Sequence, residues 1–221
     1  MYAVTQGTFR SPRGQTVTLN YREDTNDWNT LNACLTEDEY GLRDLRLTGV
    51  ALDIGAYIGG VTIGLALDNP ELYVVAVEAV PPNVVLLREN VIRAGVADRV
   101  TVVEGAAGDG KPVMLNWGYS GNVAADHHSF IGNAVMPEAD LRASHAEMVD
   151  TITLASMVAD YGPFCFAKID CEGCEYPFLS GSLEGVDLIR GEEHYGPLDL
   201  PGFDVTYTQG NAPRGFEAVR R

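Results

Sequence analysis

The chain has 221 residues, of which 46% are hydrophobic, and this size and composition suit one α/β domain with a substantial core. Its formal net charge is −16, and so acidic a surface repels phosphate backbones and anionic lipids, which excludes nucleic acid and membranes as expected partners. The sequence contains no run of about 18 apolar residues and does not begin with the basic and apolar regions of a signal peptide, so we expect a cytoplasmic protein.

The first 48 residues predict a lead-in to the main domain. The segments Tyr2–Phe9 and Gln15–Tyr21 alternate apolar and polar residues around a Ser-Pro-Arg-Gly turn, which predicts a β-hairpin. Residues 24–47 mix helical and irregular patterns. We expect a single domain over residues 1–221, with 1–48 as the hairpin and helical lead-in and 49–221 as the core.

From residue 50 onward, apolar strands alternate with helices. This order predicts a parallel sheet with right-handed crossovers, interrupted by an irregular insertion near residues 116–148. The expected strands are Val50–Ile54, Leu72–Val77, Val100–Val103, Val149–Leu154, Phe164–Ile169 and Val186–Arg190, followed by an antiparallel pair, Phe203–Thr208 and Gly215–Val219. The expected helices are Gly60–Leu67, a helix that begins at Pro81, and Ala155–Tyr161.

The first expected strand runs into a glycine turn, Gly55-Ala-Tyr-Ile-Gly59. A dinucleotide site needs a middle glycine where the backbone approaches a pyrophosphate, and Tyr57 occupies that place. Asp53 at the strand end would repel a diphosphate and attract the ammonium of S-adenosylmethionine (SAM). Glu78, at the tip of the second strand, is placed to bind ribose hydroxyls. These residues favour SAM, and an NAD(P)-dependent oxidoreductase is the alternative.

Three sequence blocks resemble the FkbM family of SAM-dependent methyltransferases. They are Leu52-Asp-Ile-Gly-Ala-Tyr-Ile-Gly59, Val77-Glu-Ala-Val-Pro-Pro-Asn83 with Ala106-Ala-Gly-Asp109, and Thr151-Ile-Thr-Leu154 through Lys168-Ile-Asp-Cys-Glu-Gly-Cys-Glu175. The resemblance implies the class I methyltransferase fold, a Rossmann-like three-layer sandwich whose seven-stranded, mostly parallel sheet has an antiparallel C-terminal strand. It also implies O-methyl transfer to a small molecule, natural product or sugar. The family usually has asparagine where this chain has Tyr57.

On this basis we expect the cofactor to be bound near the ends of the first strands. The expected SAM-binding residues are Asp53, Gly55, Ala56, Tyr57, Gly59, Glu78, Ala79, Ala106 and Asp170. A non-catalytic interaction protein with the same fold is a further alternative. The sequence leaves the oligomeric state open, and a homodimer is one possibility.

Methyl transfer to an alcohol requires that the hydroxyl lose its proton, so a base or a metal ion is expected near the acceptor. His194 is the first candidate for the base, because the unperturbed pKa of histidine is about 6.5. Asp170 and Glu193 end neighbouring strands and are the other catalytic candidates. Asp170 could instead hold SAM or the substrate, or join Glu193 and His194 around a divalent metal, although no metal is the favoured hypothesis. A strand-end histidine without a catalytic role is the alternative for His194.

The insertion and the turn after residues 164–169 supply candidate acceptor contacts. They are His127, His128 and Glu172, with plain loop residues as the alternative. Cys171 and Cys174 form a C-x-x-C pattern, which occurs in zinc half-sites and redox pairs. A zinc site would need two more ligands at suitable spacing, so we expect packing or loop cysteines.

Overall fold

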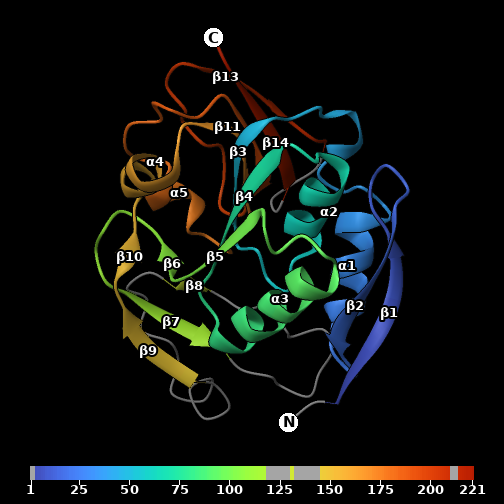
Figure 1. Ribbon diagram of the computed structural model, residues 1–221. Helices are drawn as coiled ribbons and strands as arrows, with labels where there is room; N and C mark the ends of the chain where they lie inside the picture. Colours follow the sequence, from blue (N-terminus) through green and yellow to red (C-terminus); the bar gives the residue numbers. More distant parts are fainter. Residues whose placement is uncertain (1–2, 118–129, 132–144, 210–213) are drawn as a thin grey trace.

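The computed structural model describes residues 3–117, 130–131, 145–209 and 214–221. Its main sheet has seven strands in the order β13-β14-β12-β11-β3-β4-β5 (Figure 1). Strand β14 runs antiparallel to β12 and β13, and the other neighbouring pairs are parallel, as expected. The strands are β3 (Gly49–Ile54), β4 (Leu72–Glu78), β5 (Val100–Glu104), β11 (Phe164–Ile169), β12 (Leu188–Glu193), β13 (Phe203–Tyr207) and β14 (Arg214–Arg220).

Helices cover both faces of this sheet, which accounts for the almost continuous apolar character of its central strands. Successive strand residues point to opposite faces. Thus Ala51 packs in one apolar cluster with α1 (Asp27–Leu35), α2 (Gly60–Asp68) and α3 (Pro81–Arg93). The next residue, Leu52, packs in the other cluster with α4 (Leu154–Tyr161) and α5 (Glu175–Phe178). Among the described residues, no helix has the length and apolar character needed to cross a bilayer.

The expected N-terminal hairpin is present as β1 (Val4–Arg10) and β2 (Thr16–Arg22), and it is followed by α1 and a short 3-10 helix, η1 (Leu42–Asp44). Asn90 of α3 fixes the hairpin to the core. Its side chain accepts a hydrogen bond from Asn20 N (2.7 Å) and donates to Asn20 O (3.0 Å) and Ile58 O (2.9 Å). The lead-in therefore packs directly on the face that carries the glycine turn.

The region of the expected insertion contributes a small antiparallel sheet, in which β7 (Val113–Trp117) lies between β8 (Phe130–Ile131) and β9 (His145–Val149). A second small sheet pairs β6 (Ala106–Ala107) with β10 (Thr151–Ile152) in parallel. The strand predicted at 149–154 is present only as the shorter β10, because Thr153 caps α4 by accepting a hydrogen bond from Ser156 N (3.1 Å). His127 and His128 lie outside the described residues.

The strand predicted at 186–190 is displaced toward the C-terminus. Strand β12 continues to Glu193 because Glu192 and Glu193 pair with Gly215 and Arg214 of β14. This pairing comes from the antiparallel C-terminal strand, which the local sequence of β12 does not reveal. The extension changes which acidic side chain faces the candidate site.

Candidate cofactor and acceptor site

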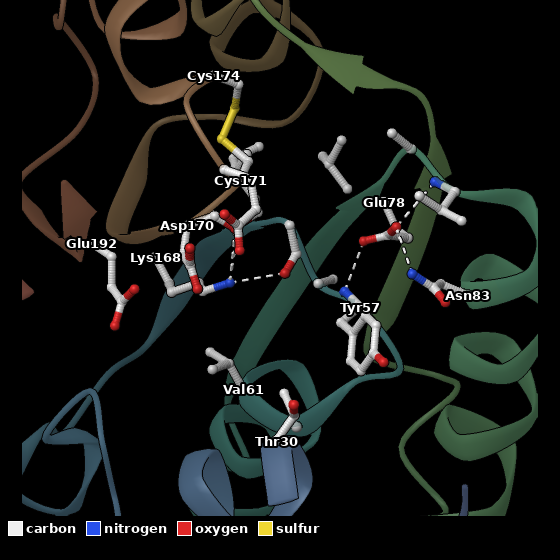
Figure 2. A pocket seen from close by; sticks show the side chains of 18 of the residues that line it. Thr30, Tyr57, Val61, Glu78, Asn83, Lys168, Asp170, Cys171, Cys174 and Glu192 are labelled. Atoms are coloured by element: carbon white, nitrogen blue, oxygen red, sulfur yellow. Dashed lines mark hydrogen bonds between the residues drawn. A yellow bond between two sulfur atoms is a disulfide. The ribbon is translucent and has the colours of Figure 1, made fainter. Parts of the chain in front are cut away.

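A cavity of about 440 Å³ lies at the carboxyl ends of β3, β4 and β11, where ligands bind in open α/β sheets. Figure 2 shows Glu78 and Asn83 on one side of it and Asp170 and Glu192 on the other. Helix α1 and the residue before it supply a further wall, formed by Asn26, Asn29, Thr30, Ala33 and Cys34. Sequence reasoning missed this wall, because nothing in the α1 sequence marks it as part of a site.

Gly55 shapes the turn after β3. Its φ is +72°, and a Cβ at this position would lie 1.8 Å from the backbone oxygen of Asp170. Glycine is thus required both by the backbone conformation and by the close approach of the two strand ends. Gly55, Ala56 and Tyr57 line the cavity, as do Ala79 and Ala106. Gly59 does not line it, because it packs beneath the turn, where an added Cβ would meet Leu87 at 2.9 Å.

Tyr57 adopts a left-handed backbone conformation, with φ of +51°. Asparagine tolerates this conformation better than most residues, which accounts for the asparagine usual in the family. Here the tyrosine is held by its side chain, since its hydroxyl donates to Asp27 Oδ1 at 2.5 Å. Asp27 is fully buried and pairs with Arg22 Nε at 2.8 Å. Burial, and then the charge of Asp27, raises the pKa of the Tyr57 phenol, which therefore remains a neutral donor.

Glu78 presents its carboxylate to the cavity from the tip of β4. It accepts hydrogen bonds from Tyr57 N (2.8 Å), Val80 N (3.0 Å) and Asn83 Nδ2 (3.2 Å). Burial raises the pKa of Glu78, and these hydrogen bonds oppose that effect. Asn83 is fully buried, and its Oδ1 has no hydrogen-bond partner among the described residues. Glu78 and Asn83 together offer fixed acceptor oxygens to a ligand that carries hydroxyl or amino groups.

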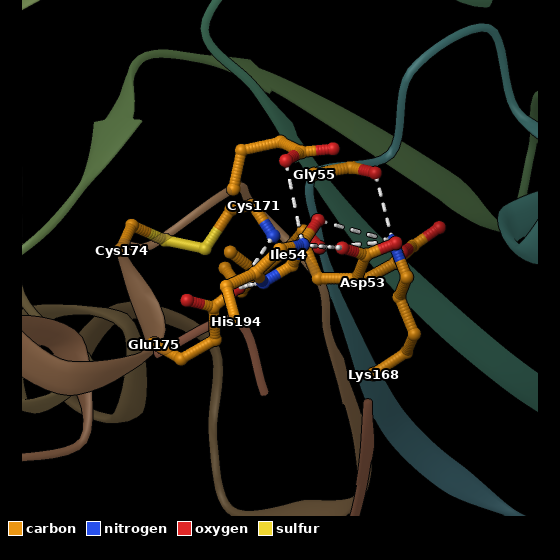
Figure 3. Close-up of a disulfide and its surroundings, with 10 residues drawn as sticks. Asp53, Ile54, Gly55, Lys168, Cys171, Cys174, Glu175 and His194 are labelled. Atoms are coloured by element: carbon orange, nitrogen blue, oxygen red, sulfur yellow. Dashed lines mark hydrogen bonds and ion pairs between the residues drawn. A yellow bond between two sulfur atoms is a disulfide. The ribbon is translucent and has the colours of Figure 1, made fainter. Parts of the chain in front are cut away.

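Asp53 lies beneath the cavity and does not line it, in contrast to the expected contact with an ammonium group. It is fully buried, accepts a hydrogen bond from Thr62 Oγ1 at 2.5 Å, and lies 3.5 Å from Lys168 Nζ. Lys168 in turn donates to the backbone oxygens of Ile54 (3.1 Å) and Gly55 (2.8 Å), as Figure 3 shows. The Asp53–Lys168 pair therefore supports the turn from below.

Asp170 follows β11 and lines the cavity, where it accepts a hydrogen bond from the Tyr40 hydroxyl at 2.6 Å. His194 follows β12 and lies beside it, with Nε2 3.8 Å from Asp170 Oδ1, 3.4 Å from Glu172 Oε2 and 3.9 Å from Glu192 Oε2. Asp170, Glu192 and His194 each place one possible ligand atom within 4.8 Å of the others, a spacing at which they could hold a metal ion.

The charge state of His194 differs from the expectation based on an ordinary imidazole. Burial lowers its pKa, but the hydrogen bond to Glu175 and the surrounding carboxylates outweigh burial and raise it to about 9. In the absence of another cation the ring is therefore protonated at neutral pH, which removes the premise on which a general-base role was expected. The pKa of Glu192 is also raised, to about 7, by burial and then by the charges of Asp170 and Glu39.

Glu193, expected among the catalytic groups, points away from the cavity. Its side chain is 1% exposed and binds Arg214 Nε at 2.6 Å. Because neighbouring residues of a strand face opposite sides, Glu192 takes the cavity side instead. The sequence shows two adjacent glutamates at the end of this strand, but it does not show which of the two side chains faces the cavity.

Cys171 and Cys174 form a disulfide with a Cα–Cα distance of 5.4 Å, so the expectation of unlinked cysteines is wrong (Figure 3). Both residues line the cavity together with Glu172, which sits between them in a left-handed conformation with φ of +58°. The disulfide thus closes the turn that carries Glu172.

The strand order and the position of the cavity define a class I methyltransferase fold. Residues 53–202 match the family model described as the methyltransferase FkbM domain, and the chain belongs to this family. One relative, O-methyltransferase imqG of Aspergillus flavus, is 33% identical over 86 residues, which are 38% of this chain and 35% of that protein. The match thus spans about a third of the relative's length.

We report two of the solved structures to which this chain is similar. A precorrin-6y C5,15-methyltransferase from Geobacter metallireducens is 15% identical, with 84% of this chain and 87% of that chain covered and a TM-score of 0.48. An O-methyltransferase from Bacillus cereus in complex with SAH is 19% identical, with 78% and 74% covered and a TM-score of 0.46.

Proposed function

We propose that this protein is a SAM-dependent O-methyltransferase that acts on a hydroxyl of a small molecule, natural product or sugar. Membership of the FkbM family supports the reaction class. The observation that carries the proposal is the carboxylate of Glu78, which three hydrogen bonds hold at the wall of the cavity beside the unpartnered buried oxygen of Asn83. The net charge of −16 favours such acceptors over nucleic acid.

The residues present fit SAM in chemical character. Glu78 and Asn83 would accept hydrogen bonds from the ribose hydroxyls and the adenine amino group, and no positively charged group faces that end to receive a phosphate among the described lining residues. At the other end, the carboxylates of Asp170, Glu172 and Glu192 suit a ligand with positive charge. When bound, SAM supplies an electrophilic methyl group on its sulfonium.

We place the acceptor beside Asp170, where β11 and β12 end. This end of the cavity is walled by Glu39 and Glu192 and bordered by His194, so it is the end with groups that can bind a hydroxyl and receive its proton. Tyr40 fixes Asp170 by its hydrogen bond, which limits the orientations that the carboxylate can adopt.

The experiment is a comparison of cofactors by calorimetry and thermal shift, with SAM, SAH and NAD. We expect SAM and SAH to bind and NAD not to bind. Glu78→Ala should weaken SAM binding on the order of 10- to 100-fold, the effect of removing hydrogen bonds to a charged acceptor. Glu71→Ala is the matched control, because Glu71 is exposed and precedes β4 at the opposite end of the sheet.

Transfer itself is measured as radioactive methyl from SAM incorporated into a panel of sugar and phenolic hydroxyl compounds. Binding of NAD in place of SAM would indicate an oxidoreductase. Binding of SAM without transfer to any compound of this panel would count against the proposed O-methyl transfer and favour a non-catalytic protein.

A further inference from the structure

Three groups that commonly ligate metals meet where β11 and β12 end. His194 Nε2 lies 3.8 Å from Asp170 Oδ1 and 3.9 Å from Glu192 Oε2. Two ligands of one ion, each at about 2.1 Å, can lie at most about 4.2 Å apart. Both measured distances are below this limit for a pair, but three ligands of one ion at about 2.1 Å can be at most about 3.6 Å apart on average. The three ligand atoms, which lie within 4.8 Å of one another, would therefore need to move closer together by up to about 1 Å.

The orientation of His194 is set by a residue outside this group of three. Glu175 is fully buried and its Oε1 lies 2.9 Å from His194 Nδ1. The same oxygen accepts a hydrogen bond from Cys171 N at 3.1 Å, so the carboxylate is itself fixed. Imidazoles that bind metals usually donate their second ring N–H to such a carboxylate, which turns the free nitrogen toward the ion. Here that free nitrogen is Nε2, and it faces Asp170 and Glu192.

The end of the cavity around Asp170, Glu192 and His194 carries more negative than positive charge. Glu39, Asp170, Glu172 and Glu192 all line this end of the cavity. Lys168 also lines it, but its ammonium is engaged below by Asp53 and by the carbonyl oxygens of the turn. Four carboxylates at one wall repel one another, and a divalent cation would relieve that repulsion where the three ligand groups meet.

We infer that Asp170, Glu192 and His194 bind a divalent cation that contacts the acceptor hydroxyl, an inference that rests on the proposed methyl transfer. Two carboxylates and one imidazole form a mostly oxygen ligand set, which suits Mn²⁺. The ion would lower the pKa of the acceptor hydroxyl. The O–H proton leaves to a neighbouring carboxylate or water, the oxygen bonds to the methyl carbon, and the C–S electron pair returns to sulfur. The ion is unchanged by the reaction.

The direct test is Mn²⁺ binding to the chelator-treated full chain, followed by calorimetry and by loss of the electron paramagnetic resonance signal of free Mn²⁺. We expect one ion per chain. Glu192→Gln and His194→Ala should abolish or strongly weaken binding, and Glu175→Gln should weaken it about 10- to 100-fold as the support of a ligand. Glu184→Gln is the control, since Glu184 is exposed and precedes β12 at the opposite end of the sheet.

Circular dichroism and the melting temperature of each variant separate loss of a ligand from loss of folding. Chelation should leave SAM binding intact and suppress methyl transfer, and Mn²⁺ should restore it. If no Mn²⁺ binds, or if Glu192→Gln binds it as tightly as the parent protein, the metal site is refuted while SAM binding still supports the proposed function. If SAM does not bind but Mn²⁺ binds at these three residues, the proposed function fails and the site stands.

Discussion

The hydroxyl of Tyr57 offers a sharp test of how the glycine turn is held. Tyr57→Phe deletes the hydrogen bond to Asp27 Oδ1 and leaves the backbone N–H that orients Glu78. Hydrogen bonds to charged groups contribute about 1.5–3 kcal/mol. Because Asp27 Oδ1 keeps a bond from Arg22 Nη2 at 2.9 Å, it is not left unpaired, and we expect the lower end of that range. A loss of about 1.5 kcal/mol corresponds to a fall of about 3–6 °C in Tm.

The assay is urea unfolding of the parent and variant, with the slope of each transition compared, together with calorimetric SAM binding. Tyr73→Phe is the matched control, because the Tyr73 hydroxyl contacts Thr101 Oγ1 at the surface. We expect the control to lose less than about 0.5 kcal/mol, as surface substitutions do, and Tyr57→Phe to bind SAM within about threefold of the parent, a change below about 0.7 kcal/mol. Equal stability losses in the two variants would refute the reasoning.

Two further substitutions test the support of the turn by stability alone. Gly55→Ala should abolish soluble expression or cost more than about 4 kcal/mol, because its Cβ would lie 1.8 Å from a backbone oxygen, whereas Gly14→Ala, at a φ of +90° with open space around it, should cost only about 1–2 kcal/mol. Lys168→Met should cost about 3–5 kcal/mol by leaving Asp53 buried without its cation. A loss equal to that of the exposed Lys111→Met would contradict the assigned pairing.

The fold could be read from the sequence because its signals are local. Buried parallel strands have continuous apolar runs, and glycine at residue 55 marks a turn that no other residue can make. Glu78 ends its strand, so the position of its carboxylate followed from the strand itself. The alternation of strands and helices predicted the parallel sheet, whereas its seven strands were expected from the resemblance to the family.

The parts that sequence reasoning missed depend on contacts between distant segments. Whether Glu192 or Glu193 faces the cavity is decided by pairing with β14, more than 20 residues further along the chain. The interaction of Asp53 with Lys168 likewise joins two strands far apart in sequence, so Asp53 was expected to contact a ligand directly. The wall formed by α1 depends on docking of the lead-in, which no motif in α1 records.

The residues around the cavity come from almost the whole length of the chain, from Asn26 in the N-terminal lead-in to Glu192 on β12. Such a cavity exists only when distant segments have come together, so a ligand that fills it binds the complete native state and not a partly folded one. Its binding free energy should then appear as slower amide hydrogen exchange in every segment that opens only by global unfolding, including strands that never touch the ligand. Cofactor binding would thus stabilise only the completely folded chain.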